Sequence, residues 1–227
     1  MTKRTVKIGS YDTALVGWTL TGIKLSDPVQ KTNYVEKSGG DGSWDLSTVM
    51  TEGIPRYKNR SLTLTFECSK GSRADREILI RDMVNQLDGF EQEIVLPDRP
   101  QHYLRGRVHV AVTQHSPAYA SISVTADVEP WFYAARETVV MLEAPITMST
   151  ETATFQIWNQ GRRVVSPLIT VDGVAHLTFN GIHTDLATGT FEWAAFQLRP
   201  GMNELIYTGS MDATDTLTLT YREAVLR

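Results

Sequence analysis

The side chains that most often perform chemistry are few in this sequence and far apart. Its five histidines are His102, His109, His115, His176 and His183, and none lies within four residues of another. Metal sites that can be recognised in a sequence have ligands at short, regular spacings. The spacing here therefore predicts no metal site, and each histidine is expected to have a structural role.

The other reactive groups also lack a catalytic context. The sequence contains no phosphate-binding loop, no HExxH, no CxxC, no G-x-S-x-G and no glycine-rich dinucleotide fingerprint. Its single cysteine, Cys68, falls on the apolar side of an alternating segment, where a free cysteine behaves as a small hydrophobe. We therefore predict no catalytic residue, no cofactor and no internal disulfide.

A glycosidase is one alternative, because that activity can reside on a β-sandwich. It needs two carboxyl groups roughly 5–10 Å apart. The candidates are the pair Glu91 and Glu93 on a predicted strand and the pair Asp212 and Asp215 at a predicted turn. Neither pair has a partner cleft that the sequence reveals, and a solvated face explains both pairs better.

Sugar binding is a second alternative, because aromatic rings stack on sugar faces. The candidate rings are Trp158, Phe191, Trp193 and Phe196. Phe191 and Trp193 share one face of a predicted strand, which is also the pattern of core residues. We expect both in the core, so this alternative requires Trp158 or Trp193 to be exposed.

The charge balance argues against tight nucleic-acid binding and divides the chain. There are 22 basic and 26 acidic side chains, whereas tight binding to nucleic acid needs clustered cations. Residues 138–227 hold 5 arginines, no lysine and 9 acids, so the net charge of −4 resides there. This shift, together with Glu143-Ala144-Pro145, predicts two domains, residues 1–137 and 138–227.

The hydropathy pattern favours a soluble protein made in a cytoplasm. The first residues lack the apolar run of a signal peptide. No stretch approaches the roughly 20 apolar residues of a membrane span. No membrane partner is expected.

Residues 1–137 are predicted to form an α+β domain, in which one helix covers the apolar face of a twisted antiparallel sheet. The helix, Arg73–Asp88, is predicted from a capping box of Ser72 and Asp75 and from an apolar stripe that leaves Arg76 on the outer face; the stripe consists of Ile80, Met83, Val84 and Leu87. Three glycines in residues 38–43 predict a turn. The predicted strands are Lys3–Ile8, Leu15–Leu20, Ile23–Leu25, Ser61–Cys68, Gln92–Leu96, Gly106–Thr113 and Ala120–Val128.

Residues 138–227 are predicted to form a β-sandwich, because short strands recur between turn signals and no helix pattern is present. The turns include Asn159-Gln160-Gly161 and Asn180-Gly181. The predicted strands are Ala153–Trp158, Leu168–Val171, Ala175–Phe179, Thr190–Leu198, Asn203–Thr208 and Thr214–Arg222. The fold class is therefore mainly β throughout.

Many weak motifs, taken in order, make the sequence resemble the distal tail protein family of long-tailed bacteriophages. No single motif is specific, but the order and spacing extend over nearly the whole chain. The motifs include Gly9-Ser10-Tyr11-Asp12, Gly39-Gly40-Asp41-Gly42-Ser43-Trp44-Asp45, Ile94-Val95-Leu96-Pro97-Asp98, Tyr103-Leu104-Arg105-Gly106-Arg107, Glu129-Pro130-Trp131, Asn159-Gln160-Gly161 and Arg199-Pro200-Gly201-Met202-Asn203.

The resemblance implies a structural subunit of a phage or prophage tail tip, with no catalytic residues. Members of the family form a ring, commonly a hexamer, between the tail tube and the tip or baseplate, and DNA passes through the ring without specific binding. The second domain is then a galectin-like or carbohydrate-module-like sandwich that docks receptor-binding proteins or a tail-associated lysin. A carbohydrate-binding adhesion module of a phage tail is the alternative.

A ring subunit needs loops or strand edges with which its neighbours can pair. The glycine-rich segment and its flank are the expected contact, with Gly39, Asp41, Trp44 and Asp45 as candidate interface residues. A mobile surface loop without a partner is the competing interpretation of the same segment.

Overall fold

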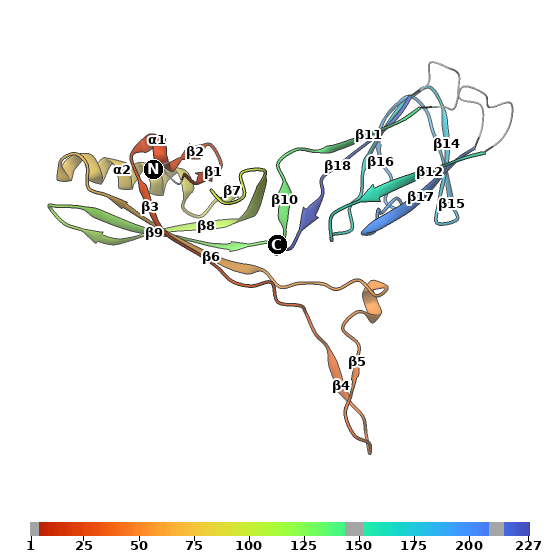
Figure 1. Ribbon diagram of the computed structural model, residues 1–227, viewed down its shortest axis with the longest axis horizontal. Coiled ribbons are helices and arrows are strands. Elements are labelled where there is room, and N and C mark those ends of the chain that lie inside the picture. The colour runs from red at the N-terminus through yellow and green to blue at the C-terminus, as the bar shows by residue number, and fades with distance from the viewer. Residues whose placement is uncertain (1–4, 144–151, 209–215) are drawn as a thin grey trace. The chain divides into compact units, whose positions relative to one another are not determined.

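The computed structural model describes residues 5–143, 152–208 and 216–227 (Figure 1). The chain divides into two compact units, Met1–Pro130 and Trp131–Arg227. The boundary predicted from charge, between residues 137 and 138, stays a prediction. The chain is mainly β, as the sequence predicted. Within these ranges no helix is both long enough and apolar enough to cross a membrane.

The first unit is built on an antiparallel sheet with strand order β2-β1-β7-β8-β9-β6-β3. Every neighbouring pair along this order is antiparallel. The strands are β1 (Lys7–Ile8), β2 (Tyr11–Asp12), β3 (Thr19–Leu25), β6 (Arg60–Cys68), β7 (Glu91–Val95), β8 (His102–His115) and β9 (Ala120–Val128).

Alternation along the central strands forms the core of this unit. In β6, Leu62, Leu64, Phe66 and Cys68 are buried, as the period of two predicted. Ile122 and Val124 of β9 lie directly opposite Phe66 and Leu64 and are also buried. Cys68 is thus a core residue, in agreement with its assignment as a small hydrophobe.

Helix α2 (Arg73–Leu87) begins with the predicted capping box and contacts β8. The Ser72 hydroxyl accepts from the Asp75 N–H, and the Asp75 carboxylate accepts from the Ser72 N–H at 2.8 Å. Met83 and Leu87 are buried, as predicted, but the assignment of Arg76 to the outer face is wrong. Arg76 is 1% exposed, because its guanidinium donates to the carbonyls of Gly71 and Pro117 at 2.7 and 2.6 Å.

The N-terminal prediction was partly wrong. Residues predicted as the strand Leu15–Leu20 instead include a one-turn helix, α1 (Thr13–Val16), which Asp12 caps through the Ala14 N–H. Gly17 ends the helix at φ +104°, and β3 follows with a bulge between Leu20 and Gly22. The predicted strand Lys3–Ile8 is represented by β1, and residues 1–4 lie outside the described residues.

Between β3 and β6 the chain leaves the sheet and returns (Figure 1). This excursion carries β4 (Tyr34–Glu36), β5 (Ser43–Asp45) and a 3₁₀ turn, η1 (Val49–Thr51). Strands β4 and β5 form a separate two-stranded sheet. The predicted turn at residues 38–43 joins them, with Gly39 and Gly42 at φ +74° and +77°.

The second unit consists of two four-stranded antiparallel sheets that share one hydrophobic cluster. Their orders are β11-β18-β13-β16 and β12-β17-β14-β15. The strands are β11 (Thr138–Glu143), β12 (Thr152–Asn159), β13 (Leu168–Asp172), β14 (Ala175–Phe179), β15 (Ile182–Leu186), β16 (Gly189–Glu192), β17 (Gly201–Thr208) and β18 (Thr216–Tyr221). A short pair, β10 (Phe132–Ala134) with β19 (Ala224–Val225), completes the unit.

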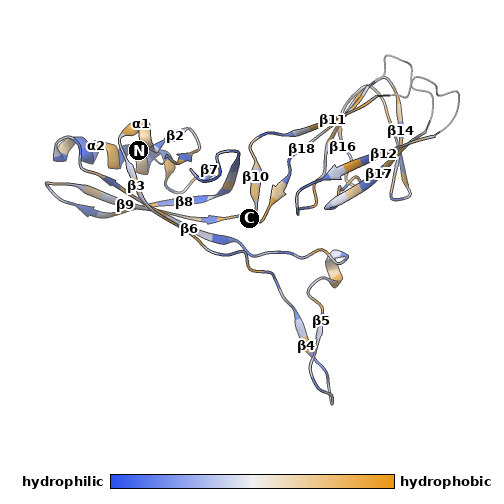
Figure 2. Ribbon diagram, in the orientation of Figure 1, coloured by the Kyte–Doolittle hydropathy of each residue, from blue (hydrophilic) through white to orange (hydrophobic). Residues whose placement is uncertain are grey.

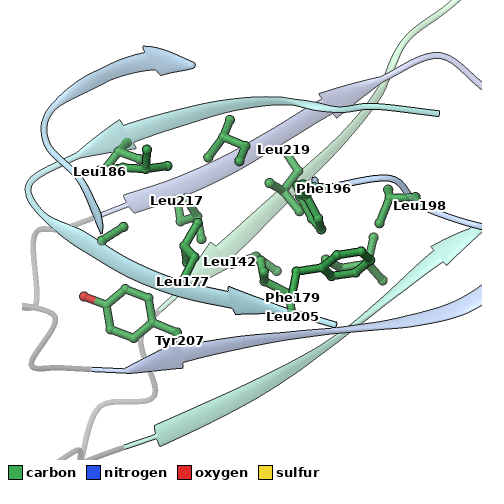
Figure 3. Packing of buried hydrophobic residues seen from close by; sticks show 14 of the residues in the cluster. Leu142, Leu177, Phe179, Leu186, Phe196, Leu198, Leu205, Tyr207, Leu217 and Leu219 are labelled. Atoms are coloured by element: carbon green, nitrogen blue, oxygen red, sulfur yellow. The ribbon is translucent and has the colours of Figure 1, made fainter. Parts of the chain in front are cut away.

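Both sheets contribute side chains to that cluster, as a sandwich requires (Figure 3). Leu217 and Leu219 come from one sheet, and Leu177 and Leu205 from the other. Tyr207 packs beside them and donates from its hydroxyl to the Val174 carbonyl at 3.0 Å. The β-sandwich prediction is therefore confirmed at the level of strand layers.

One strand prediction in this unit needs correction, and some strands of the unit were not predicted. The predicted strand Thr190–Leu198 ends at Glu192, where a turn closed by the Phe196 N–H to Trp193 carbonyl bond begins. Strands β11 and β15 and the short pair of β10 and β19 were not predicted. The beginning of the predicted strand Thr214–Arg222 lies outside the described residues, and its remainder is β18.

Two buried asparagines, Asn159 and Asn203, hold neighbouring loop backbone through their side chains. The Asn159 amide donates to the carbonyls of Arg163 and Leu198, at 2.8 and 3.1 Å. The Asn203 amide donates to the Arg199 carbonyl at 2.8 Å, and its oxygen accepts from the Arg199 N–H at 2.8 Å. Both asparagines are buried, so they are structural.

Candidate functional site: an exposed apolar arm

The excursion between β3 and β6 is a hairpin with a narrow base, which we call the arm (residues 29–58). At its base the Lys58 N–H donates to the Val29 carbonyl and the Lys31 N–H to the Arg56 carbonyl, both at 2.8 Å. Farther out, Leu46 N–H donates to the Asn33 carbonyl at 2.8 Å. The backbone of the arm is therefore paired within the arm.

The side chains of the arm lack the burial that normally stabilises a hairpin. All residues from 29 to 58 are described, and none of them is buried. Tyr34, Val35, Trp44, Val49 and Met50 are exposed, with Trp44 at 60% and Met50 at 93%. The 3₁₀ turn η1 is coloured toward the hydrophobic end of the scale in Figure 2. A two-stranded hairpin without a packed face is marginal in water, and clustered exposed apolar side chains mark an interaction surface.

One face of the hairpin carries an aromatic centre. Val35 pairs directly with Trp44, so both lie on the same face, while Tyr34 and Asp45 pair on the other. The ammonium of Lys37 lies 4.9 Å from the centroid of the Trp44 ring, within the range of a cation–π contact. Tryptophan is among the residues most enriched where binding energy concentrates in interfaces, so Trp44 is the candidate centre of this face.

Polar contacts fix the chain between β5 and η1. The Asp45 carboxylate accepts from the Ser47 N–H at 2.9 Å, and the Ser47 hydroxyl accepts from the Asn33 N–H at 2.8 Å. Hydrogen bonds from the Ser47 side chain and N–H hold the pKa of Asp45 below its usual value. An ionised Asp45 therefore supports the local shape of the arm at neutral pH.

The four predicted interface residues all lie on this hairpin. Gly39 and Asp41 are at its exposed tip, and Trp44 and Asp45 are neighbours on β5 with side chains on opposite faces. Their role as an interface stays a prediction. Sequence reasoning missed Tyr34, Val49 and Met50, because only a turn was predicted in this part of the chain and the sequence alone does not show which apolar side chains are exposed.

The carboxylate pair Glu91 and Glu93 lines a shallow pocket together with Gly9, Gln92 and Arg105. Glu91 forms an ion pair with Arg105 across the β7–β8 strand pair. A carboxylate held by a guanidinium has its negative charge compensated, which does not suit the general acid of a glycosidase. Asp212 and Asp215 lie outside the described residues.

The candidate sugar-binding rings divide into two groups. Phe196 is fully buried, and Phe191 and Trp193 pack against the cluster of the sandwich, as expected for core residues. Trp158 is 58% exposed on β12, directly opposite the exposed Met202 of β17. Trp158 therefore satisfies the exposure that the carbohydrate alternative required.

Two of the five histidines come together, contrary to the expectation from their spacing. His176 of β14 and His183 of β15 both contact the Asp185 carboxylate, at 2.6 and 2.9 Å. The pKa of Asp185 is lowered, chiefly by its hydrogen bond with His176. His109 instead meets one carboxylate, that of Asp88, at 3.2 Å. The Asn180-Gly181 turn was the available signal, because a two-residue turn fixes which residues face each other across the hairpin.

The fold can be compared with those of known proteins. No protein-family profile and no curated protein sequence matches the chain. Among solved structures, the chain is similar to the crystal structure of the Dit protein (gp 19.1) of phage SPP1, with a TM-score of 0.68. The match covers 96% of this chain and 98% of that one, at 14% sequence identity. That protein is described as a paradigm of the hub adsorption apparatus in phages that infect Gram-positive bacteria.

The architecture of this chain is thus the same as that of the SPP1 Dit protein. Because the match extends over both units and nearly the whole of each chain, it concerns the complete architecture and not a widespread sub-fold such as a β-sandwich. The chain has the distal tail protein fold, as the resemblance in sequence motifs predicted.

Proposed function

We propose that this chain is a distal tail protein, a structural subunit whose copies form a ring at the tip of a long bacteriophage or prophage tail. Similarity of the whole fold to the hub protein of phage SPP1 carries this proposal. The ring joins the tail tube to the tip or baseplate proteins, and DNA passes through it. The role is structural and not enzymatic.

The arm supplies the physical reason for self-association. Its apolar side chains gain from burial against another surface, at roughly 25 cal/mol per Å² of apolar area removed from water. In a closed ring each subunit offers one surface to a different surface of the next, so an arm that seats on a neighbour fits cyclic symmetry. We propose that Trp44 is the centre of this contact, with Gly39, Asp41 and Asp45 around it.

A channel for DNA should not bind its cargo tightly. Tight binding depends on clustered cations that displace counterions from phosphate. The chain carries 22 basic against 26 acidic side chains, which supports passage without specific binding.

The experiment measures the mass of the purified full chain in solution as a function of concentration, by light scattering and mass photometry. We expect oligomers of a single order and ring-shaped particles in electron micrographs, with six copies as the first expectation. Trp44→Ala is expected to shift the population to monomers. Trp158→Ala is the matched control, because Trp158 is 58% exposed and Trp44 is 60% exposed.

A strict monomer at high protein concentration would count against the ring. If rings form equally well from wild-type chain and Trp44→Ala, the ring stands but the arm is not its main contact. If Trp158→Ala dissociates the ring and Trp44→Ala does not, the contact belongs to the second unit.

Exposure of Trp158 beside Met202 favours a second candidate function, recognition of carbohydrate by the sandwich. The chain would then bind purified cell-wall glycans of its host, and Trp158→Ala would abolish that binding while leaving any ring intact. Equal glycan binding by the wild type and this variant would contradict a carbohydrate site at Trp158.

A further inference from the structure

Hairpin β14–β15 places two histidines and an aspartate on one face. Its register pairs His176 with Asp185 and Thr178 with His183, so these four residues share the outer face of the sheet. Asn180 and Gly181, at φ +48° and +78°, form the two-residue turn that sets this register. The inner face carries Ala175, Leu177 and Phe179, which are buried in the sandwich core. The hairpin is therefore held in place from behind, and its outer side chains are presented by a fixed backbone.

The ligand atoms lie close together. His176 Nδ1 is 2.6 Å and His183 Nε2 is 2.9 Å from the same oxygen, Oδ1 of Asp185. One nitrogen from each imidazole and one carboxylate oxygen lie within 4.8 Å of one another. The two imidazole rings are nearly parallel, with an interplanar angle of 2° and centroids 6.4 Å apart. The two rings therefore direct one nitrogen each toward the same carboxylate.

We propose that His176, His183 and Asp185 bind one divalent transition-metal ion of the zinc type. Two imidazoles and a carboxylate are a preferred ligand set for such ions, and for Zn²⁺ the bonds to nitrogen and oxygen are about 2.0–2.2 Å long. Ligand atoms of one ion therefore lie roughly 3–4 Å apart. Small rotations of these three solvent-accessible side chains would bring the 4.8 Å arrangement into this range. The ion takes the place of the protons that His176 and His183 share with Asp185.

Thr178 provides the outer contact that such a site needs. The hydroxyl of Thr178 lies 3.2 Å from His183 Nδ1, the ring nitrogen opposite the proposed ligand atom. Metal-binding histidines generally donate their other N–H to an oxygen, which fixes the ring and its tautomer. With Nε2 on the metal, His183 donates from Nδ1 to the Thr178 hydroxyl. Thr178 is thus a positioning residue for the site.

Three protein ligands leave at least one position of the ion open to water. His183 and Asp185 are exposed and His176 is partly so, which gives the ion direct access from solvent. Strand β15 is the last strand of its sheet, so the ion also ties that edge to β14. This site belongs to the second unit alone and is independent of the arm and of ring formation.

The test is a competition titration of the chelator-treated full chain with Zn²⁺ against a chromophoric zinc chelator. We expect one site that is lost in His176→Ala and in His183→Ala. His109→Ala is the matched control, because His109 is an exposed histidine that contacts one carboxylate and no second imidazole. Thr178→Val is expected to weaken binding by roughly tenfold, since outer contacts typically contribute 10–100-fold.

The fold of each variant is checked by circular dichroism, and we expect it to be retained because substitutions on the outer face remove no core contact. A second readout follows the imidazole ¹⁵N signals, of which those of His176 and His183 should shift together on addition of Zn²⁺. The proposal is overturned if the wild-type chain does not compete for Zn²⁺. It is also overturned if His183→Ala binds as tightly as the wild type, or if His109→Ala is the variant that loses the site.

Discussion

The hairpins β4–β5 and β14–β15 are both short, antiparallel and closed by turns that contain glycine. They differ in whether one face is packed into a hydrophobic core. In β14–β15 one face packs into the sandwich through Leu177 and Phe179. In β4–β5 both faces are exposed, including the one that carries Val35 and Trp44. A hairpin with one face packed into a core of its own chain is stabilised by that core and can carry polar groups on its other face. A hairpin with no buried face needs a binding partner that covers its apolar side chains.

The largest expected effect contrasts the two hairpins directly. Leu177→Ala removes a fully buried side chain, and we expect a loss of about 2–5 kcal/mol in the free energy of unfolding. Trp44→Ala removes a larger but exposed side chain, and we expect a change within about 0.5 kcal/mol. Urea denaturation at a concentration where the chain is monomeric measures both. A loss in Trp44→Ala as large as that in Leu177→Ala would mean that the arm packs within its own chain.

In a third hairpin, β8–β9, hydrogen bonds from an arginine of α2 hold the turn in place. The Arg76 guanidinium donates to the carbonyls of Ser116 and Pro117 in its turn, at 3.2 and 2.6 Å. Arg76→Ala leaves these carbonyls without their charged donor, and we expect a loss of about 2–3 kcal/mol in urea denaturation. Arg81→Ala is the control on the same helix, because the Arg81 side chain is exposed. Equal stability of the two variants would show that packing alone holds this tip.

The next prediction concerns the turn of the arm. Gly42 has φ +77°, a conformation that costs an L-residue roughly 1–2 kcal/mol, so Gly42→Ala should weaken the hairpin. Gly40→Ala is the control, since Gly40 lacks a positive φ and a Cβ there meets only ordinary contacts. If the arm joins neighbouring subunits, Gly42→Ala raises the concentration at which oligomers form and Gly40→Ala does not. Identical association curves for the two variants would indicate that the tip conformation does not matter for assembly.

Local patterns carried most of what was predictable in this fold. The alternation of Leu62, Leu64, Phe66 and Cys68 and the capping box of α2 each depend on a few neighbouring residues, and both are present in the structure. Arg76 was wrongly predicted to lie on the outer face of the helix, because its burial depends on residues that are distant in the sequence. Its partners Ser116 and Pro117 lie about forty positions away in the sequence, so no local pattern shows that its charge is satisfied inside the unit.

The two candidate sites were predictable to different degrees. Glycines and a tryptophan at residues 39–44 were enough to single out the arm, but apolar residues such as Met50 reveal their exposure only in three dimensions. The spacing of His176 and His183 gave no sign that they come together, because they are seven positions apart along the chain. Register across the Asn180-Gly181 turn brings them together, and that follows only if a strand is placed on each side of the turn.

Lowering the pH should have the smallest effect on stability, and it should act differently on the arm and on the sheet of the first unit. The pKa values of Asp45 in the arm and Asp75 in the capping box are both lowered by hydrogen bonds, from Ser47 and from Ser72 respectively. A carboxyl group whose pKa is lower in the folded than in the unfolded state stabilises the folded state at every pH above its unfolded pKa. This contribution is lost as the pH falls through the folded pKa. The relevant window therefore lies below about pH 4.

Because the arm has no buried residue, protonation of Asp45 should loosen the arm without affecting global unfolding, whereas protonation of Asp75 should weaken a helix that packs on the sheet. Amide exchange at Ser47 reports the first effect, and the urea midpoint between pH 5 and pH 2.5 reports the second. Asp45→Asn should abolish the acid dependence of Ser47 protection and leave the midpoint unchanged. Asp75→Asn should lower the midpoint at pH 5 and flatten its decline toward acid. A midpoint that responds to Asp45→Asn would contradict the separation of arm and sheet, since it would require the two to unfold as one cooperative unit.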